Sequence, residues 1–170
     1  MTLDVDQFRS PIGMLVVAAR DGRLCALEFA ARWPRRQRVL ARRFGSVVTR
    51  RTPDPAGAVT ALRAYFSGDR DALARVAVDP GGTEFQRKVW AALVRIPPGR
   101  TLSYRELAAT IGAPAAVRAV GAANGANPVA LVIPCHRVIA ADGTLGGYAG
   151  GLHRKRWLLA HEGAPAGSAA

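Results

Sequence analysis

The chain has 170 residues, 49% of them apolar, and its 24 Lys and Arg residues outnumber 12 Asp and Glu residues for a net charge of +12. That length allows one or two domains, and the apolar share is enough to bury a core, which excludes an intrinsically disordered chain. No apolar run approaches the roughly 18 residues of a membrane span, and the N-terminal residues lack the basic-then-apolar layout of a signal peptide, so we expect a cytoplasmic protein without a membrane partner.

Residues 1–79 are predicted to form a small α+β domain. Three short apolar-rich runs typical of β-strands come first: residues 2–8, 14–20 and 23–29. Asp21-Gly22, between the last two runs, is a two-residue hairpin signal, so we expect a small antiparallel sheet. Two stretches with helical patterns and one strand-like run follow: residues 35–44, 56–66 and 74–78. Asp79-Pro80-Gly81-Gly82 is the clearest linker in the chain and places a domain boundary after residue 79.

Arginine supplies most of the positive charge. Of the 24 cationic residues 22 are arginines, whose planar guanidinium suits phosphate recognition. The densest stretch, residues 32–51, contains eight arginines and no acidic residue. Two interpretations of this stretch stay open: a solvated helix face and loop, or an auxiliary contact to nucleic-acid phosphates.

Two capping boxes mark helix starts in the second half of the chain, residues 80–163. Thr83 is followed by Gln86, and Ser103 by Glu106, so that hydroxyl and third-position side chain can satisfy each other's free backbone amides. The first of these helices should end at Pro97-Pro98-Gly99. The second half is therefore predicted to be a mostly helical domain.

A helix-turn-helix is predicted over residues 103–124. Residues 103–111 and 114–124 have helical patterns and are separated by a very tight turn, with Pro114 in the first turn of the second helix. That second helix presents Arg118 alone among small residues. It is interpreted either as a helix packed tightly on a neighbour or as one making close shape contact with DNA through a single probing arginine.

The candidate chemical centre is Pro-Cys-His-Arg-Val at residues 134–138. It follows an apolar run of strand type, 129–133, and Cys135 beside His136 at the end of a buried strand is a candidate activated nucleophile. Neighbouring side chains of a strand face opposite sides, so a bend after Pro134 would be needed to bring sulfur and imidazole together. Glu162 could orient the imidazole. A buried, inert cysteine beside an incidental histidine stays open as the alternative.

The cysteines and histidines of the chain do not have the spacing of a metal site. Cys25 lies in an apolar run, and we expect it to pack in the core. Only three histidines are present, His136, His153 and His161, and none has a ligand spacing from either cysteine that would close a tetrahedral site. No metal site and no cofactor are therefore expected.

These motifs resemble the O6-alkylguanine-DNA alkyltransferases, also called methylated-DNA protein-cysteine methyltransferases. The resemblance rests on residues 134–138, on Asn127-Pro128 and 118–121 before them, and on 146–148 and 158–163 after them. It implies an α/β (α+β) fold: an N-terminal ribonuclease-H-like domain with a small antiparallel sheet and helices, then a C-terminal alkyltransferase domain that carries the helix-turn-helix. Residues 164–170 would be a flexible tail.

The resemblance also implies roles for the residues of the chemical centre. Cys135 is similar to the alkyl acceptor, His136 to the base that acts on it through a water, and Glu162 to the partner of that histidine. Asn127 matches the asparagine that braces the turn between recognition helix and active-site strand. Tyr104 matches the tyrosine that donates a hydrogen bond to the flipped guanine.

Further residues are implied in DNA and substrate binding. Arg118 matches the arginine that fills the gap left in the duplex, and Tyr148 belongs to the loop that closes over the base. The other residues implied in this contact are Gly146, Gly147, Ala149, Ala119, Gly121, Ala122 and Asn124. Ala149 stands where some relatives carry a serine, so only a backbone amide can serve O6 of the guanine there.

The function implied is direct reversal of DNA damage. A methyl or other alkyl group would pass from O6-alkylguanine, and from O4-alkylthymine, in duplex DNA to Cys135 after base flipping, irreversibly and once per protein molecule. The partner would be duplex DNA, bound through the minor groove without sequence preference by a monomer, with clustering on DNA left open.

Three rival functions are weighed against this one. A non-catalytic alkylated-DNA recognition protein of the same family would lack the acceptor cysteine, whereas Cys135 is present. A papain-like hydrolase fits poorly because nucleophile and base are adjacent and no separate oxyanion motif is seen. A transcriptional regulator would need more long base-reading side chains on its recognition helix.

Overall fold

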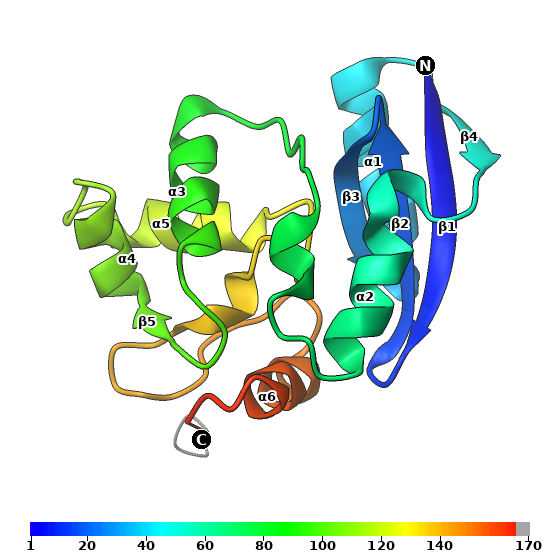
Figure 1. Cartoon of the computed structure of the whole chain (residues 1–170). Coiled ribbons are helices and arrows are strands. Elements are labelled where there is room, and N and C mark those ends of the chain that lie inside the picture. Colours follow the sequence, from blue (N-terminus) through cyan, green and yellow to red (C-terminus); the bar gives the residue numbers. More distant parts are fainter. Residues whose placement is uncertain (166–170) are drawn as a thin grey trace. The chain divides into compact units, whose positions relative to one another are not determined.

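A computed structural model describes residues 1–165, which fold into two units (Figure 1). The first unit consists of Met1–Gly81 together with Pro128–Val132, and the second begins with Gly82–Asn127 and resumes at Ile133. The segment 128–132, predicted for the second domain, thus belongs to the first unit. Of the expected flexible tail, residues 166–170 lie outside the described residues, whereas Ala164 is buried and donates its amide to the carbonyl of Leu159.

The sheet of the first unit begins as predicted. β1 (Thr2–Ser10), β2 (Gly13–Arg20) and β3 (Arg23–Phe29) form an antiparallel meander. Asp21 and Gly22 both have positive φ, 50° and 72°, as a type I′ hairpin turn requires. The predicted hairpin is therefore confirmed.

A fourth strand was not predicted. β4 (Val48–Arg51) pairs with β1 in parallel, so the sheet has the order β3-β2-β1-β4 and is not purely antiparallel as expected. All four residues of β4 are exposed. An exposed edge strand lacks the apolar alternation by which strands are recognised, and its sequence was assigned to the arginine-rich stretch instead.

Two helices cover opposite faces of this sheet (Figure 1). α1 (Trp33–Phe44) packs on the side of Leu3, and α2 (Ala58–Phe66) packs on the other side, where Phe66 stacks on Phe8. Leu3 and Phe8 belong to alternate faces of β1, as the period of two in a strand dictates.

Two predicted boundaries in this unit are wrong. α2 begins at Ala58 and not at Ala56, because Ala56 has a φ of 56° and the Asp54 carboxylate accepts the amides of Val59 and Thr60. The strand expected at 74–78 does not form: Ala74 and Arg75 end a short 3₁₀ helix, and only Val78 forms a bridge to the sheet. Four such 3₁₀ helices occur among the described residues: Ala30–Arg32, Pro55–Gly57, Ala72–Arg75 and Cys135–Arg137.

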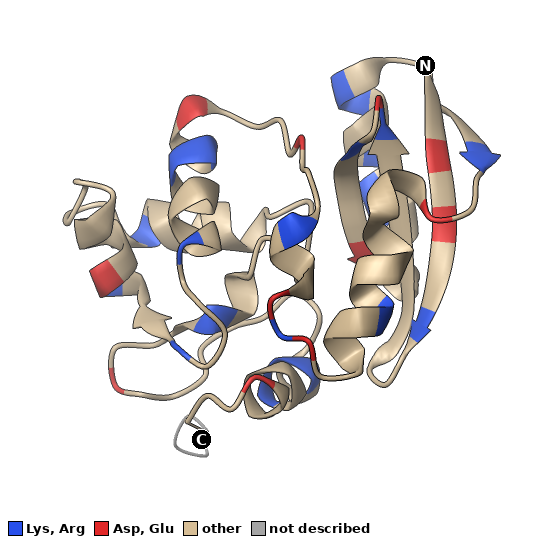
Figure 2. Ribbon diagram, in the orientation of Figure 1, with Lys and Arg blue, Asp and Glu red and all other residues tan. Residues whose placement is uncertain are grey.

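Several arginines of the stretch 32–51 form ion pairs within the protein, so neither of the two interpretations left open describes the whole stretch. Arg36 is buried and pairs with buried Glu28 at 3.1 Å. Three more of its arginines form ion pairs within the first unit: Arg32 with Glu28 at 3.4 Å, Arg43 with Asp79 at 2.7 Å and Arg50 with Asp4 at 2.6 Å. Figure 2 shows that basic residues are spread over strands and helices of both units.

The second unit is mostly helical, as predicted. Its helices are α3 (Glu84–Val94), α4 (Tyr104–Thr110), α5 (Val117–Gly125) and α6 (Leu152–His161), and one short parallel pair joins β5 (Leu102–Ser103) to β6 (Val138–Ile139). Both capping boxes are present, with Thr83 and Ser103 accepting the amides of Gln86 and Glu106. α5 packs on α3, where the Trp90 indole donates to the carbonyl of Ala123 at 2.9 Å.

α5 begins later than predicted. Pro114 and Ala115 lie in a turn that follows Gly112, whose φ is 74°, and regular helix starts only at Val117. The connection between α4 and α5 is therefore longer than the very tight turn expected, and the helix-turn-helix stays an interpretation. None of the helices within residues 1–165 is long and apolar enough to cross a membrane.

Candidate active site

Cys135 sits on a tight turn and not at the end of a strand. The expected strand at 129–133 is wrong, because this segment forms isolated bridges, such as the parallel one between Val129 and Leu27, and Leu131 has a positive φ of 68°. At Pro134 the chain bends and enters the short 3₁₀ helix Cys135–Arg137 before β6. The bend predicted after Pro134 is therefore present, and Cys135 and His136 do not alternate as strand neighbours would.

Two asparagines of the segment that ends α5 brace this turn. The Asn127 amide donates to the carbonyl of Ile133 at 2.7 Å, on the near side of Pro134. The Asn124 amide donates to the carbonyl of Cys135 at 3.4 Å. Both asparagines are buried, so these hydrogen bonds satisfy backbone groups that water cannot reach.

His136 belongs to a buried charged cluster. Its side chain is fully buried, and Nε2 lies 2.9 Å from Oε1 of Glu162, which is also buried. Arg137 holds the same carboxylate with two hydrogen bonds, Nε to Oε2 at 2.9 Å and Nη2 to Oε1 at 2.8 Å. A third bond runs from Nη1 of Arg137 to the carbonyl of Ile96 at 2.5 Å. This paired, charge-assisted arrangement fixes the carboxylate in one orientation.

The protonation states of this cluster follow from burial and pairing. Burial alone would raise the pKa of Glu162, but the hydrogen bonds from His136 and Arg137 outweigh it and hold that pKa well below its usual range. Burial lowers the pKa of His136 more than Glu162 raises it, so the imidazole is neutral near pH 7. With Nε2 donating to the carboxylate, Nδ1 is the unprotonated nitrogen. Nδ1 has no hydrogen-bond partner within residues 1–165, so it is the atom that can accept a proton.

Lys155 on α6 is a site residue that the sequence prediction missed. Its side chain is fully buried, and Nζ donates to the carbonyls of Val138 and Leu145, both at 2.5 Å, and of Gly147 at 3.1 Å. Burial lowers its pKa to about 8, whereas the charge interaction with Cys135 acts in the opposite direction. A signal was available, because Lys155 lies three and four residues before buried Leu158 and Leu159 and so on the apolar face of the helix.

Tyr104 lies between two glycines. A Cβ added to Gly146, whose φ is 67°, would lie 3.3 Å from Cε2 of Tyr104, and one added to Gly121 of α5 would lie 3.9 Å from Cδ1. Glycine at residue 146 therefore suits both the backbone conformation and the close approach of the ring. Burial raises the pKa of Tyr104, as does Cys135, so the phenol is protonated at neutral pH and able to donate.

The predicted DNA-contacting residues of α5 separate into two groups. Arg118, Ala119 and Ala122 are exposed, and Gly121 is half-buried. Asn124 is only 5% exposed and bonds to the turn of Cys135, so its placement on the DNA-facing surface is wrong. The reason is helical periodicity, because Asn124 falls on the inner face of α5 beside buried Val120 and Ala123.

The loop predicted to close over the base is only partly exposed. Gly147 and Ala149 are exposed, whereas Gly146 and Tyr148 are half-buried. The Gly147 carbonyl is held by Lys155, which ties this loop to β6. The described residues contain no group of three or more His, Cys, Asp or Glu side chains that could hold a metal ion.

The comparison with known proteins decides the family. Two family descriptions match the chain: "6-O-methylguanine DNA methyltransferase, ribonuclease-like domain" over residues 7–80 and "6-O-methylguanine DNA methyltransferase, DNA binding domain" over residues 84–164. The methylated-DNA–protein-cysteine methyltransferase of Salmonella typhimurium is 45% identical over 161 residues, 93% of this chain and 94% of that protein. The chain belongs to this family of 6-O-methylguanine DNA methyltransferases.

Further members of the family agree. The methylated-DNA–protein-cysteine methyltransferase of Mycolicibacterium paratuberculosis is 49% identical over 90% of this chain and 88% of its own. The crystal structure of Mycobacterium tuberculosis OGT in complex with DNA superposes with a TM-score of 0.78 at 42% identity, covering 98% of this chain and 96% of the other. The predicted family, the α+β fold class and the methyltransferase class are thereby confirmed. The roles of individual site residues stay predictions.

Proposed function

We propose that the protein repairs alkylated DNA by moving an alkyl group from O6 of guanine to Sγ of Cys135, once per molecule. The observation that carries this proposal is the arrangement around one turn of chain. Cys135 directly precedes an imidazole whose Nε2 is engaged by a buried carboxylate and whose Nδ1 is free to accept a proton. A thiol needs such a base, because the thiolate and not the thiol is the nucleophile.

The activation step uses the whole charged cluster. Nδ1 of His136 accepts the thiol proton of Cys135 through a water, and the imidazolium that forms faces the Glu162 carboxylate at 2.9 Å. Arg137 keeps that carboxylate ionised and oriented through its two hydrogen bonds. The thiolate then attacks the alkyl carbon in line, so that the S–C bond forms as the C–O6 bond breaks and the electron pair passes to guanine.

Protonation of the leaving guanine is assigned to Tyr104. Its phenol is protonated at neutral pH because burial raises its pKa, and it lies beside Gly146 of the loop predicted to cover the base. A donor placed where negative charge develops lowers the barrier most in a site that excludes water. With no hydroxyl at Ala149, a backbone amide of the loop serves O6.

The lesion must leave the duplex to reach this sulfur. Cys135 is only 7% exposed, so a stacked base cannot present its alkyl carbon to it. Flipping a base out costs a few kcal/mol. Arg118, exposed on α5, offsets part of this cost by filling the gap in the stack. We assign binding to the minor groove of duplex DNA by a monomer, with O4-alkylthymine as a second substrate.

Product formation inactivates the protein. The thioether on Cys135 is chemically inert, and the proposed chemistry supplies no group to hydrolyse it. The amount of DNA repaired therefore equals the amount of protein.

The test is a mass measurement at equal concentrations of protein and duplex oligonucleotide containing one O6-methylguanine. We expect an increment of about 14 Da, a methyl in place of a proton, confined to the peptide that carries Cys135. Excess DNA should leave the repaired amount equal to the protein. Turnover beyond one equivalent, or an unmodified Cys135, would contradict the proposal.

Arg118→Ala tests the assignment of base flipping. The variant should react about tenfold more slowly with O6-methylguanine in a duplex but at an unchanged rate with the free base, because only the duplex has a gap to fill. Arg23→Ala, which removes an exposed arginine of β3, is the matched charge control and should affect neither rate strongly. Equal loss on duplex and free base would reject this role of Arg118.

A further inference from the structure

The side-chain amide nitrogen of Asn124 forms a hydrogen bond with the turn that carries Cys135. The side chain is only 5% exposed, and Nδ2 donates to the carbonyl of Cys135 at 3.4 Å. Because a carbonyl can only accept, this bond identifies which end of the amide faces Cys135. Nδ2 carries a second N–H, so one donor is left for another acceptor near the sulfur.

Tyr104 is the acceptor that we infer for that second donor. Gly121, one helical turn before Asn124, is the residue of α5 that lies against the Tyr104 ring. Residues three apart on a helix share a face, so Asn124 lies beside the same ring. Burial raises the pKa of Tyr104, and a hydrogen bond with the Asn124 side chain acts against it. A hydrogen bond from an N–H to the phenol oxygen lowers the pKa of a tyrosine, because such a bond favours the phenolate.

We propose that Asn124 is a positioning residue, whose amide donates to both the Cys135 carbonyl and the Tyr104 hydroxyl oxygen and so aims the Tyr104 O–H at the leaving guanine. This inference rests on the proposed function of Cys135 and Tyr104. An N–H on one lone pair of the hydroxyl oxygen turns the O–H bond away from α5. Tyr104 is also held against Gly146, so its proton is directed toward the loop predicted to cover the base.

The proton balance gives Asn124 its effect on the rate. As the S–C bond forms and the C–O6 bond breaks, the electron pair passes to guanine and Tyr104 delivers its proton there. The Asn124 N–H stabilises the phenolate left behind, which then regains a proton from solvent, while the thiol proton leaves through His136. Through Tyr104, Asn124 thus assists only a leaving group that needs a proton, whereas its bond to the Cys135 carbonyl acts alike on every electrophile.

The test compares two electrophiles that attack the same sulfur. An oligonucleotide containing O6-methylguanine has a leaving group that needs protonation, whereas iodoacetamide releases iodide, which does not. Asn124→Leu keeps the size and removes the donors. We expect its rate of Cys135 modification to fall about tenfold further with the oligonucleotide than with iodoacetamide, whose reaction reports the loss of the bond to the Cys135 carbonyl.

A double-mutant cycle with Tyr104→Phe separates positioning from damage to the fold. If Asn124 acts through the hydroxyl, the ratio of the oligonucleotide rate to the iodoacetamide rate should be no lower in the double variant than in Tyr104→Phe alone. Asn124→Ala provides a second donor-free side chain with high helix propensity. Val120→Ala, a buried change in the same helix without a polar contact to the site, is the control for a loss of packing and should not discriminate between the two reagents.

Three outcomes would overturn the role of Asn124 alone: equal loss with both electrophiles, additive losses in the double variant, or an unchanged rate with the oligonucleotide. In each case the wild-type protein would still form its adduct. Failure of the wild-type protein to methylate Cys135, while iodoacetamide labels it, would instead contradict the proposed function and this inference together.

Discussion

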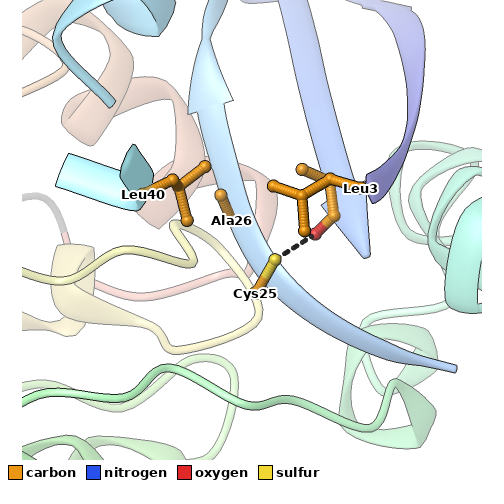
Figure 3. Packing of buried hydrophobic residues seen from close by; sticks show 5 residues of the cluster. Leu3, Cys25, Ala26 and Leu40 are labelled. Carbon is orange, nitrogen blue, oxygen red and sulfur yellow. Dashed lines mark hydrogen bonds between the residues drawn. The ribbon is translucent and has the colours of Figure 1, made fainter. Parts of the chain in front are cut away.

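The protein buries two cysteines in different chemical settings. Cys25 on β3 is 1% exposed and packs in an apolar cluster with Leu3, Ala26 and Leu40 (Figure 3). Its Sγ donates to the carbonyl of Ala18 at 3.2 Å. Cys135 is 7% exposed, hardly more, so exposure to solvent does not separate the two thiols.

Polar neighbours make the difference. Burial raises the pKa of Cys25 to about 11, so this thiol stays protonated and unreactive at neutral pH. Cys135 has the imidazole of His136 next to it in the chain and interacts with the Lys155 ammonium, whose charge favours a thiolate. The proposed function thus assigns nucleophilic chemistry to the buried thiol that has an imidazole and a cation beside it, whereas the buried thiol without them is part of the core.

The largest expected effect is the loss of all transfer in Cys135→Ala. This variant should form no adduct with a methylated duplex, whereas Cys25→Ala should react at close to the wild-type rate. Single-turnover assays of repaired oligonucleotide measure both rates. If Cys25→Ala lost transfer as completely as Cys135→Ala while remaining folded, the distinction between the two sulfurs would fail.

The charged cluster next to Cys135 should make the stability of the protein sensitive to acid. In the folded state the pKa of Glu162 and that of His136 are both lowered. The unfolded chain therefore binds more protons below about pH 6.5 for His136 and below about pH 4.3 for Glu162, the ordinary pKa values. The free energy of unfolding should fall as the pH drops through these two windows. Urea denaturation followed by circular dichroism at a series of pH values measures this fall.

Glu162→Gln tests which group is responsible. It leaves buried Arg137 and His136 without the carboxylate, so we expect a loss of about 3 kcal/mol at pH 7 and a flatter dependence on pH below about 4.3. Glu84→Gln is the matched control, because Glu84 is exposed in an i, i+4 pair with Lys88 and should cost less than about 0.5 kcal/mol. Equal losses of unfolding free energy in the two variants would show that the buried charged cluster is not responsible for the acid sensitivity.

Lys155→Met should lower the rate of transfer strongly while changing the free energy of unfolding only slightly. The variant keeps the length of the side chain but removes the donor shared by the carbonyls of Val138, Leu145 and Gly147. A buried cation is costly, so its replacement by an apolar chain changes global stability by only about 1 kcal/mol. The loop at 145–148 loses its tie to β6, and we expect a rate about tenfold lower.

Hydrogen exchange can follow this loop directly. Amides of residues 145–148 should exchange faster in Lys155→Met, and those of α3 should not. Arg156→Met removes an exposed charge from the same helix and serves as the control. A large loss of stability with unaltered loop exchange would mean that Lys155 supports the core and not the active-site loop.

Short-range signals explain what the sequence could predict. The hairpin at Asp21-Gly22 and the capping boxes at Thr83 and Ser103 are each encoded within four residues, and all three are present. β4 is different, because its pairing with β1 joins Thr2 to Val48 across the chain and leaves no apolar pattern. The apolar run 129–133 was misread because a buried irregular segment and a buried strand both demand apolar side chains.

The residues of the candidate site also divide into those that short-range signals predict and those that depend on distant contacts. Cys135, His136 and Glu162 could be named from adjacent residues and a family resemblance, and the 2.9 Å contact of His136 with Glu162 agrees with the pairing expected. Lys155 and Asn124 were missed or misplaced, since a lysine or asparagine on a helix is by default assigned to the solvated face. Their roles depend on carbonyls of distant segments, and a one-dimensional pattern does not contain those contacts.

The smallest expected effect concerns Cys25 and completes the comparison of the two thiols. Cys25→Ser replaces the sulfur with a hydroxyl that can still donate to the carbonyl of Ala18, but it places a more polar atom in an apolar cluster. We expect a loss of about 1 kcal/mol in urea denaturation and a transfer rate within about twofold of wild type. In Cys135→Ala, Cys25 should resist iodoacetamide until urea unfolds the protein, because its protonated thiol has neither access nor a base. Rapid labelling of Cys25 in the folded variant would show that burial does not protect this thiol and would contradict the contrast between the two cysteines.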